Sequence, residues 1–535
     1  MKRTMWRALL VSGLPVMMLM AGCEHHHRDV PVTTYHYDNL RTGWNDRERH
    51  LKPGNVASSR FGLLYPPVAL DDQVDAQPLV IPDQKITAGP TPGRYDVAYV
   101  ATEGNTVYAI DAATGNVLLS PNFGPPVPMP LGCNNNGPNV GINGTPVIDR
   151  ESRTLYVMVY TLESGNPAYR LHALDLATLA DRVPPVLVTA SHVLSNGTTY
   201  SFNATYQRQR PALLLAFGNV YAGFGSFCDF APDQSRGWLL GWNAGPLTPL
   251  AHNQLNDTQA TSPDTFFLSA IWMSGFGIAA DPVGNLYFVT GNSDFSGTTY
   301  DGVTNIQESI VKLSADLSSV VSLFTPFGQA GLDAGDLDFG SGGALLLPDQ
   351  PGPTPHLAAA AGKAGDLYFV DRKSLGGYTP GGPDKVVGKV SIGSCWCGQT
   401  FFARHGHARV VSSGGSQVTI WKLQTSPSFA IASEASSAPL STGQAPGFFT
   451  SVSSEGSNDA IVWAVSRPIN NSPANVLLYA FDAQPAGGST TLTQLYSGVA
   501  GNWPNTGGNA NIVPVVADGK VFVASNQQLA VFGLH

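Results

Sequence analysis

The sequence predicts an all-β protein built from many short strands, on three observations. Glycine and proline contribute 58 and 40 of the 535 residues, which supplies many turns. Of all residues, 43% are hydrophobic but only 13% are charged, where soluble domains average about 25%. No segment keeps an apolar period of 3.6 residues long enough for a substantial helix, while a pair of apolar strands recurs along the chain. We therefore expect repeated β-sheets joined by polar turns.

The first residues predict a secretory leader that ends at a lipid-modified cysteine. Lys2, Arg3 and Arg7 form a positive region, and residues 8–20 form an apolar stretch too short to span a bilayer as a mature helix. The sequence Leu-Met-Ala-Gly-Cys at positions 19–23 resembles a bacterial lipobox. Residues 1–22 are thus expected to be a lipoprotein signal peptide, with Cys23 attached to the membrane through acyl chains.

The residues around the leader also predict where the protein resides. Glu24 follows the cysteine in place of the aspartate associated with inner-membrane retention, which favours the outer membrane of a bacterial envelope. Without residues 1–22 the formal charge is −12, which argues against nucleic acid as a partner. Residues 23–34, with His25, His26 and His27, are expected to form a polar tether, and residues 35–535 a single domain. Nothing in these patterns specifies an oligomeric state.

Four further cysteines predict two disulfides in an oxidising compartment. They are Cys133, Cys228, Cys395 and Cys397, and four cysteines allow three pairings. One option is a tight ring through Cys395 and Cys397, which leaves Cys133 with Cys228. A zinc site is disfavoured because there is no C-x-x-C pair, and a c-type haem is excluded because there is no C-x-x-C-H.

The recurring unit is about sixty residues long and consists of an apolar strand, a short turn and a second strand with an aromatic or large apolar residue. These markers are Tyr99, Tyr156, Tyr221, Tyr287, Leu357, Trp421, Trp463 and Phe522. Eight copies predict a β-propeller of about eight four-stranded blades, with seven as the alternative and a short sixth copy. The strands near residues 61–65 and 528–534 lack a partner in their own copy, so together they are expected to close the ring.

The turn that ends a copy supports a family resemblance. Tyr108-Ala109-Ile110-Asp111-Ala112-Ala113-Thr114-Gly115 resembles the end of a pyrroloquinoline-quinone (PQQ) repeat, and the resemblance covers about residues 35–534. Three segments, at residues 271–275, 337–343 and 405–406, are similar to features of quinoprotein-alcohol-dehydrogenase-like propellers. The tryptophan that usually follows this turn is replaced by Leu119 in one copy and by Tyr496 in another.

Residues just before the inner strands are the candidates for a pocket at the centre of the ring. Arg208 and Arg210 are suited to clamp a carboxylate or phosphate, or else to bond carbonyl groups of the blades. Trp272 can form a stacking surface, or else fill the channel. The glycines of residues 340–343 precede a strand rather than a helix, so we expect them to allow close approach near the axis rather than to bind phosphate.

Two further groups are candidate cation or proton sites. Asp333, Asp336 and Asp338 offer oxygen ligands of the kind that calcium takes, but without the spacing of an EF-hand, so acidic turns are the alternative. His405 and His407 are predicted to precede the sixth inner strand on one of its faces and could hold a metal, although no third ligand can be identified. We therefore assign no metal site.

The resemblance implies either of two functions, and the residues favour the first. This is a lipid-anchored envelope propeller that serves as a binding or assembly scaffold for a protein partner and carries no cofactor. The second is a PQQ- and calcium-dependent dehydrogenase that oxidises an alcohol or a sugar. The adjacent cysteines usual in that group are absent, and no catalytic residue can be assigned. A third option is a carbohydrate-binding propeller that uses Trp272.

Overall fold

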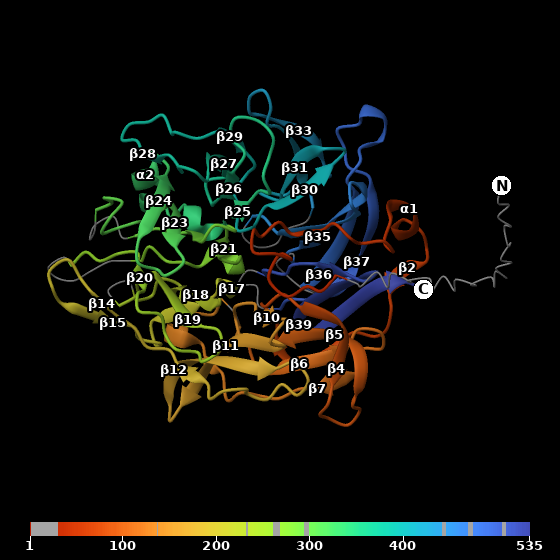
Figure 1. Ribbon diagram of the computed structural model, residues 1–535, viewed down its shortest axis with the longest axis horizontal. Helices are drawn as coiled ribbons and strands as arrows, with labels where there is room; N and C mark the ends of the chain where they lie inside the picture. The colour runs from red at the N-terminus through yellow and green to blue at the C-terminus, as the bar shows by residue number, and fades with distance from the viewer. Residues whose placement is uncertain are drawn as a thin grey trace.

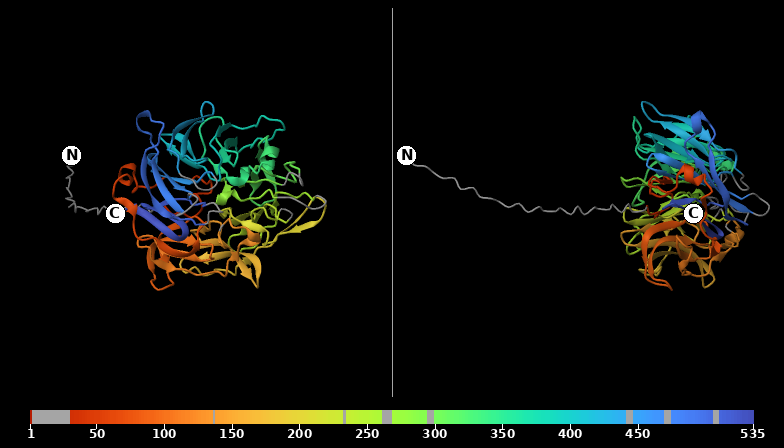
Figure 2. Two further views of the ribbon diagram at one scale, coloured as in Figure 1. Left: turned by 180° about the vertical axis from the view of Figure 1, so that it is seen from behind. Right: turned by 90° about the vertical axis from the view of Figure 1, so that its right-hand side faces the viewer.

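Eight sheets of four or five strands surround a central axis in the described part of the chain (Figure 1). The structure is a computed structural model, and it describes Met1 and residues 30–135, 137–231, 234–260, 268–293, 299–440, 446–468, 474–504 and 510–535. The chain passes once around the ring, so that the C-terminal β39 lies beside β5 and β6 (Figure 1). Seen from its edge, the ring is thinner along the axis than across it (Figure 2).

Each sheet is one blade, and the blades are numbered in chain order. Within a blade, the strands are given from the innermost to the outermost. Blade 1 is made of β4 (Leu79–Ile86), β5 (Gly93–Ala101), β6 (Val107–Asp111) and β7 (Val117–Leu119), and blade 2 of β10 (Val147–Asp149), β11 (Thr154–Glu163), β12 (Asn166–Asp175) and β13 (Val186–Leu187). Blade 3 is made of β16 (Gln207–Gln209), β17 (Leu214–Ala216), β18 (Asn219–Ser226), β19 (Trp238–Asn243) and β20 (Gln254–Leu255). Blade 4 is made of β21 (Ala279–Ala280), β22 (Asn285–Val289), β23 (Ile310–Ser314), β24 (Val320–Thr325) and β28 (Gly377–Tyr378).

The next three blades complete the repeat along the chain. Blade 5 is made of β25 (Leu345–Leu346), β26 (Leu357–Ala361), β27 (Asp366–Asp371) and β29 (Gly388–Ser391), and blade 6 of β30 (Thr400–Arg404), β31 (His407–Ser412), β32 (Thr419–Gln424) and β33 (Ala430–Ser436). Blade 7 is made of β34 (Phe449–Glu455), β35 (Asn458–Ser466), β36 (Asn475–Asp482) and β37 (Gln494–Asn502), with β1 (Trp44–Asn45) parallel to β34.

Blade 8 combines both ends of the chain, as predicted. It holds β38 (Val515–Ala517), β39 (Lys520–Leu534), β2 (Phe61–Leu63) and β3 (Val68–Gln73). Gln527, with a φ of 55°, divides β39 into a first part that pairs with β38 and a second part that pairs with β2 and β3. Phe61 lies opposite Leu534, and Leu63 opposite Phe532. The ring is thereby closed by strands from both termini.

The remaining elements are short and lie in the connections between strands. They are α1 (Pro53–Val56), α2 (Gln329–Ala334), the 3₁₀ turns η1 (Pro130–Gly132), η2 (Met273–Gly275), η3 (Phe339–Ser341) and η4 (Ala486–Gly488), and the two hairpins β8 (Val127–Pro128) with β9 (Asn139–Val140) and β14 (Ser191–Val193) with β15 (Thr199–Ser201). No helix among the described residues is long and apolar enough to cross a bilayer.

The sixth copy of the repeat is not short, which corrects one expectation. Trp421 belongs to β32, the third strand of blade 6, and not to the second strand. The second strand is β31, whose Val410 lies 53 residues from both Leu357 and Trp463. The spacing therefore stays regular, and the apparent irregularity arose because blade 6 has its aromatic residue one strand further out.

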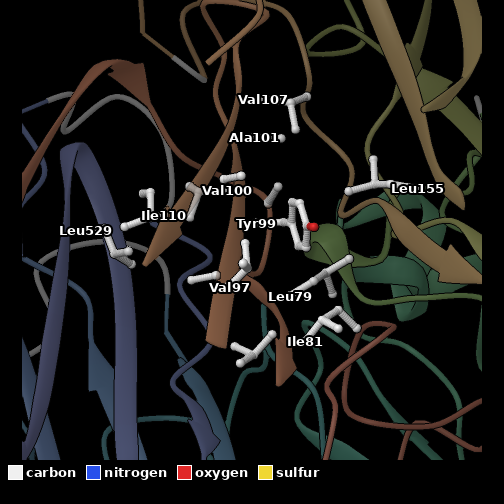
Figure 3. Close-up of a cluster of buried hydrophobic side chains, with 14 of the residues drawn as sticks. Leu79, Ile81, Val97, Tyr99, Val100, Ala101, Val107, Ile110, Leu155 and Leu529 are labelled. Atoms are coloured by element: carbon white, nitrogen blue, oxygen red, sulfur yellow. The ribbon is translucent and has the colours of Figure 1, made fainter. Parts of the chain in front are cut away.

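Neighbouring blades are held together by apolar side chains that interdigitate between sheets. Leu529 of β39 packs in one buried cluster with Val97 and Ile110 of blade 1, and Leu155 of blade 2 belongs to the same cluster (Figure 3). Each fully buried side chain of this size contributes about 1.5–3 kcal/mol. Since the cluster joins the last blade to the first two, it also seals the ring.

The segment before blade 1, residues 32–48, lies inside the ring and contacts the inner strand of every blade. It runs in blade order, because successive residues bond to successive blades. The bonds are Val32 N to Val80 O (2.8 Å), Ile148 N to Thr33 O (2.8 Å), Asn39 Nδ2 to Leu215 O (2.9 Å), Ala280 N to Asn39 O (2.7 Å), Leu346 N to Leu40 O (2.9 Å), Phe401 N to Thr42 O (2.7 Å), Val452 N to Gly43 O (2.8 Å) and Asn45 Nδ2 to Val516 O (3.0 Å). We call residues 32–48 the inner loop. The predicted tether boundary at residue 34 falls inside it, and Val32 and Thr34 are buried.

Candidate functional pocket

A cavity of about 170 Å³ lies on the axis at the end of the ring where the inner strands begin. Its wall is built from several blades, mostly by residues that come just before an inner strand or just after a second strand. The lining residues are Asn135, Arg208, Arg210, Ser226, Cys228, Asp229, Trp272, Asp338, Lys363 and Trp396. This is the position at which sequence analysis placed a central pocket, and we call it the axial pocket.

Two buried arginines bring positive charge to one side of the axial pocket, opposed by the nearby Asp75 and Glu103. Arg208 and Arg210 are only 3% and 8% exposed. Arg208 Nε donates to Asn143 Oδ1 at 3.1 Å, but Arg208 Nη2 and Arg210 Nε have no hydrogen-bond partner among the described residues. A buried N–H without a partner is costly, so these two groups are suited to receive an acceptor from a ligand.

Burial lowers the pKa of two arginines at this site, and repulsion between neighbouring guanidinium groups adds to the effect at Arg210. Burial, and next the charge of Arg208, lower the pKa of Arg210 to about 9. Burial also lowers the pKa of Arg467, which lies nearby, to about 9, and its Nη2 donates to the carbonyl oxygen of Trp396. At neutral pH these groups remain cationic. An anion in the axial pocket would offset both the desolvation and the repulsion.

Trp272 and Trp396 supply the flat apolar surfaces of the axial pocket. Trp272 immediately precedes η2, and its ring centroid lies 5.4 Å from Arg210 Cζ. Lys363 Nζ lies 5.7 Å from the ring centroid of Trp272 and 5.5 Å from that of Trp396. The two indole rings thus flank the lysine ammonium, an arrangement stabilised by cation–π attraction.

Lys363 is also the centre of an ion triad. Its Nζ lies 2.8 Å from Asp336 Oδ1 and forms a short ion pair with Asp338 Oδ2. Asp338 Oδ1 accepts the backbone N–H of Asn292 at 2.9 Å. Although burial disfavours the charged form, the Lys363 ammonium outweighs it and lowers the pKa of Asp338. Asp338 is therefore an ionised, paired carboxylate at neutral pH.

The triad leaves little capacity for a metal ion. Asp336 and Asp338 bind Lys363, and Asp333 Oδ1 accepts the backbone N–H of Ser293 at 2.6 Å. Within the described ranges no group of three or more histidine, cysteine, aspartate or glutamate side chains is placed to hold a metal. The acidic residues that sequence analysis considered as calcium ligands thus serve backbone and lysine contacts in this structure.

Asp229 is a further acidic residue of the axial pocket, and sequence analysis missed it. It follows Cys228, and both residues adopt left-handed backbone with φ of 55° and 53°. Asp229 lines the cavity while it remains exposed at the surface, and it accepts a short hydrogen bond from Ser226 Oγ. Desolvation there, and next the Asp338 carboxylate, raise the pKa of Asp229 to about 6.

Both disulfides lie at the wall of the axial pocket. Cys133 bonds to Cys228 with a Cα–Cα distance of 5.6 Å, and Cys395 bonds to Cys397 with a Cα–Cα distance of 4.9 Å. The first joins the loop after β8 to the loop after β18. The second closes a ring around Trp396, so it holds one of the two indole surfaces in place. The pairing is the one that sequence analysis considered first.

Aromatic residues of the inner loop pack against Phe276, which directly follows η2. Tyr35 and His36 stack at 4.5 Å, and Phe276 packs edge-on against them at 5.2 and 4.9 Å. Burial lowers the pKa of His36 to about 3, so this histidine is neutral and part of this apolar packing. A Cβ at Gly343 would lie 2.0 Å from Phe276 Cδ1, which confirms that glycine at residues 340–343 permits close approach near the axis.

The structure brings together Arg208, Arg210, Trp272 and Asp338 in the lining of the axial pocket. Asp336 joins them indirectly, because it forms an ion pair with the lining residue Lys363. The structure does not bring His405 and His407 to them. These histidines are exposed at the turn between β30 and β31, so they follow the inner strand of blade 6 instead of preceding it. That turn lies at the opposite end of β30 from Trp396. Cys23 and residues 25–27 lie outside the described residues.

Lys363 and Trp396 were the most informative residues that sequence analysis did not select. Lys363 sits in Ala-Gly-Lys-Ala-Gly, between β26 and β27, where a single lysine carries no pattern. Trp396 had a usable signal, because a tryptophan between two cysteines precedes β30 as Trp272 precedes β21. Asp229 and Asn135 lie in loops without any recurring motif.

No protein-family model matches this chain, and no curated protein matches it. Solved structures do match. A quinohemoprotein alcohol dehydrogenase from Pseudomonas putida HK5 is 15% identical, with a TM-score of 0.61 over 94% of this chain and 80% of that one. The corresponding enzyme from Comamonas testosteroni is 15% identical, with a TM-score of 0.56 over the same shares. A europium-containing methanol dehydrogenase is 12% identical, with a TM-score of 0.58 over 94% of this chain and 98% of that one. These likenesses show that the chain has the β-propeller fold of these enzymes.

Proposed function

We propose that this chain, which has the propeller fold of the quinoprotein dehydrogenases, is a binding protein of the bacterial envelope that holds a small organic anion in its axial pocket. One observation carries the proposal. Arg208 and Arg210 line the cavity, are almost fully buried, and keep N–H groups without a partner among the described residues. A structure that served only as a ring would gain stability by replacing them with apolar residues.

The geometry also indicates the shape of the anion. The guanidinium groups offer parallel N–H donors of the kind that bind carboxylate or phosphate in a bidentate manner. Trp272 lies beside Arg210, and the rings of Trp272 and Trp396 lie 5.7 and 5.5 Å from Lys363 Nζ. A ligand with a carboxylate next to a flat or apolar body would satisfy both kinds of surface. A neutral sugar can accept hydrogen bonds from the arginines but offers them no counter-charge, so the axial pocket gives less support to the carbohydrate-binding alternative.

Titration calorimetry with benzoate tests the proposal directly. We expect saturable binding of benzoate by the wild-type protein and none of benzamide, which has the same shape without the charge. Arg210→Gln should weaken benzoate binding at least tenfold, because it removes a buried charge–charge contact. Arg94→Gln changes an exposed arginine paired with Asp83 and is the matched control. Equal affinity of benzoate and benzamide, or full affinity in Arg210→Gln, would contradict the proposal.

A PQQ-dependent dehydrogenase is the second candidate, because the fold and the pairing of Trp272 with Lys363 favour it. PQQ is a flat ring system with three carboxylates, so the arginines, Lys363 and the indole surfaces fit its organic part. The calcium that accompanies it does not fit, since Asp336 and Asp338 are bound to Lys363 and no metal cluster occurs in the described part of the chain. We therefore derive no reaction through this group.

A turnover assay separates the two candidates. Purified protein mixed with PQQ and calcium should not reduce an artificial electron acceptor when primary alcohols or aldoses are supplied. Turnover that is lost in both Trp272→Ala and Asp338→Asn would establish the dehydrogenase and overturn the binding proposal. Quenching of tryptophan fluorescence by PQQ without turnover would agree with a pocket for organic anions.

The attachment to the envelope is a further part of the proposal. The lipobox-like residues before Cys23 support lipidation, and Glu24 after it supports an outer-membrane location. Processing that is sensitive to globomycin, and partition into the detergent phase, should both be lost in Cys23→Ala. A Cys23→Ala protein that stays in the membrane fraction would place the anchor elsewhere.

A further inference from the structure

Several of the exposed large apolar side chains lie beside residues of the axial pocket. Phe230 is 62% exposed and follows Asp229, which lines the cavity. Met129 and Leu131 are 43% and 37% exposed and belong to the loop that contains Asn135, another lining residue. We call Met129, Leu131 and Phe230 the apolar rim. Isolated exposed apolar residues need no explanation, but a group that neighbours lining residues in the chain is a candidate binding surface.

A covalent link holds the two parts of the apolar rim together. Cys133, two residues after Leu131, forms a disulfide with Cys228, two residues before Phe230. The loop after β8 and the loop after β18 are thus fixed to each other at the pocket wall.

Two residues of the apolar rim, Met129 and Leu131, have a strained backbone conformation. Met129 and Leu131 have φ of 37° and 54°, a left-handed conformation that side chains with a Cβ rarely adopt. Such strain persists only where the surrounding structure enforces it, and it concentrates at binding sites. Both side chains are exposed, and the same loop supplies Asn135 to the axial pocket.

The axial pocket therefore changes character from its depth to its mouth. Arg208 and Arg210 are almost fully buried, whereas the three residues of the apolar rim are exposed. A ligand that enters with its charged end first places that end at the arginines and leaves its other end at the rim. We infer that the ligand is an amphipathic organic acid, whose carboxylate binds the arginines and whose apolar tail lies on Met129, Leu131 and Phe230. This inference rests on the proposed anion site.

A series of unbranched carboxylates from acetate to decanoate, each below its micellar concentration, tests the inference by titration calorimetry. Wild-type affinity should rise about fourfold for each methylene that reaches the apolar rim, and then level off. 1-Octanol should bind much more weakly than octanoate, because it lacks the charge that the arginines need. The series thus measures the head and the tail separately.

Two triple variants show whether the rim is the surface that the tail contacts. Met129→Ser, Leu131→Ser and Phe230→Ser together should flatten the rise with chain length while the affinity for acetate stays unchanged. Val193→Ser, Phe217→Ser and Val283→Ser together remove three exposed apolar side chains that do not line the axial pocket, and should leave the rise intact. Circular dichroism verifies that both variants are folded.

The outcomes separate this inference from the proposed function. If acetate or benzoate binds and needs Arg210, but affinity does not rise with chain length, the anion site stands and the amphipathic ligand is wrong; the apolar rim is then a surface for a protein partner. A rise that persists in the rim variant would also overturn the inference. If no carboxylate of any length binds, both proposals fail.

Discussion

Buried arginine side chains in the centre of this ring are of two kinds: some stabilise the fold through hydrogen bonds, and others destabilise it because a buried N–H has no partner. Arg41 and Arg210 are both buried arginines, and burial lowers the pKa of each, to about 10 and about 9. Arg41 makes five hydrogen bonds to protein oxygens. Arg210 keeps its Nε without a partner among the described residues. The contrast indicates that Arg210 is retained for binding and Arg41 for structure.

Replacing Arg210 should therefore stabilise the protein while it removes ligand binding. Arg210→Met takes away a desolvated charge and keeps an apolar stem of similar length, so the free energy of unfolding should rise by about 1 kcal/mol or more. Urea denaturation followed by tryptophan fluorescence measures the change. Calorimetry with benzoate on the same variant should show no binding. A destabilised Arg210→Met protein would indicate a structural role and weaken the case for the anion site.

The pocket should bind anions more tightly in mild acid because of Asp229. Its pKa is raised to about 6, so the carboxyl is neutral below that pH and negative above it. An anionic ligand is repelled by the ionised form, and its affinity should fall as the pH rises through about 6. The same shift makes the folded state bind the proton more tightly than the unfolded state, so this group's contribution to stability is present at low pH and lost as the pH rises towards 6.

Benzoate titrations between pH 5.2 and pH 7.5 check this dependence, since benzoate stays ionised throughout. Asp229→Asn removes the titrating group and should make the affinity independent of pH over this range. Asp366→Asn changes a carboxylate on β27 that pairs with Lys389 outside the axial pocket, and it should leave the wild-type profile unchanged. An unaltered profile in Asp229→Asn would mean that another group governs the dependence.

Among the elements of the chain, the inner loop has the largest structural effect for its length. Residues 32–48 form no long strand, yet they bond to the inner strands of all eight blades. They also supply Tyr35 and His36, which pack against Phe276 next to η2. The inner loop thus connects all eight blades and adds apolar packing at the centre of the ring.

Arg41 is the residue by which this element is most easily tested. Its Nε donates to Ile278 O at 2.8 Å, and its Nη2 to Leu213 O at 3.4 Å, so it joins the inner loop to blades 3 and 4. Arg41→Met leaves several buried carbonyl groups without donors and should lower the free energy of unfolding by about 3–5 kcal/mol. Urea denaturation measures it, with Arg94→Met as the exposed control. A loss below 1 kcal/mol would show that the inner loop is dispensable for the ring.

For the molecule as a whole, the closing blade determines whether the ring unfolds as one unit. The second part of β39 pairs with β2 and β3, and Leu529 packs against blade 1 (Figure 3). A ring without this blade exposes two sheet faces and two sheet edges. Blade 8 is thus the point where the two ends of the chain stabilise each other.

Deleting residues 528–535 should destabilise every blade rather than fray one end.

Leu529→Ala is a milder change. It should lower the free energy of unfolding by about 2–5 kcal/mol, because it leaves a cavity between blades 8 and 1. Hydrogen exchange should show faster exchange in the inner strands of all blades by a similar factor. Val499→Ala, at a position that is 57% exposed on β37, is the control and should change stability by about 0.5 kcal/mol or less. Exchange that speeds up in blade 8 alone would contradict closure through this blade.

Much of the architecture could be predicted from local patterns. Strand pairs and their turns are encoded within about sixty residues, so eight copies predicted eight blades, and the unpaired strands at residues 61–65 and 528–534 predicted the closing pair. The aromatic marker misassigned one strand, because Trp421 occupies the third strand of blade 6. The candidates Arg208, Arg210, Trp272 and Asp338 were found because a position before an inner strand is also a local property.

The tertiary structure alone decided which of those candidates meet. Lys363, Trp396 and Asp229 join the axial pocket from separate blades, and no sequence spacing encodes their distances because closure of the ring brings them together. His405 and His407 lie outside the axial pocket because they follow β30, whereas the lining residue Trp396 precedes it. The length of β30 separates the two positions. The inner loop left no periodic signal, because its hydrogen-bond partners are eight different strands and not a neighbouring segment. Sequence by itself thus determined the repeated blades, and the three-dimensional closure decided the pocket.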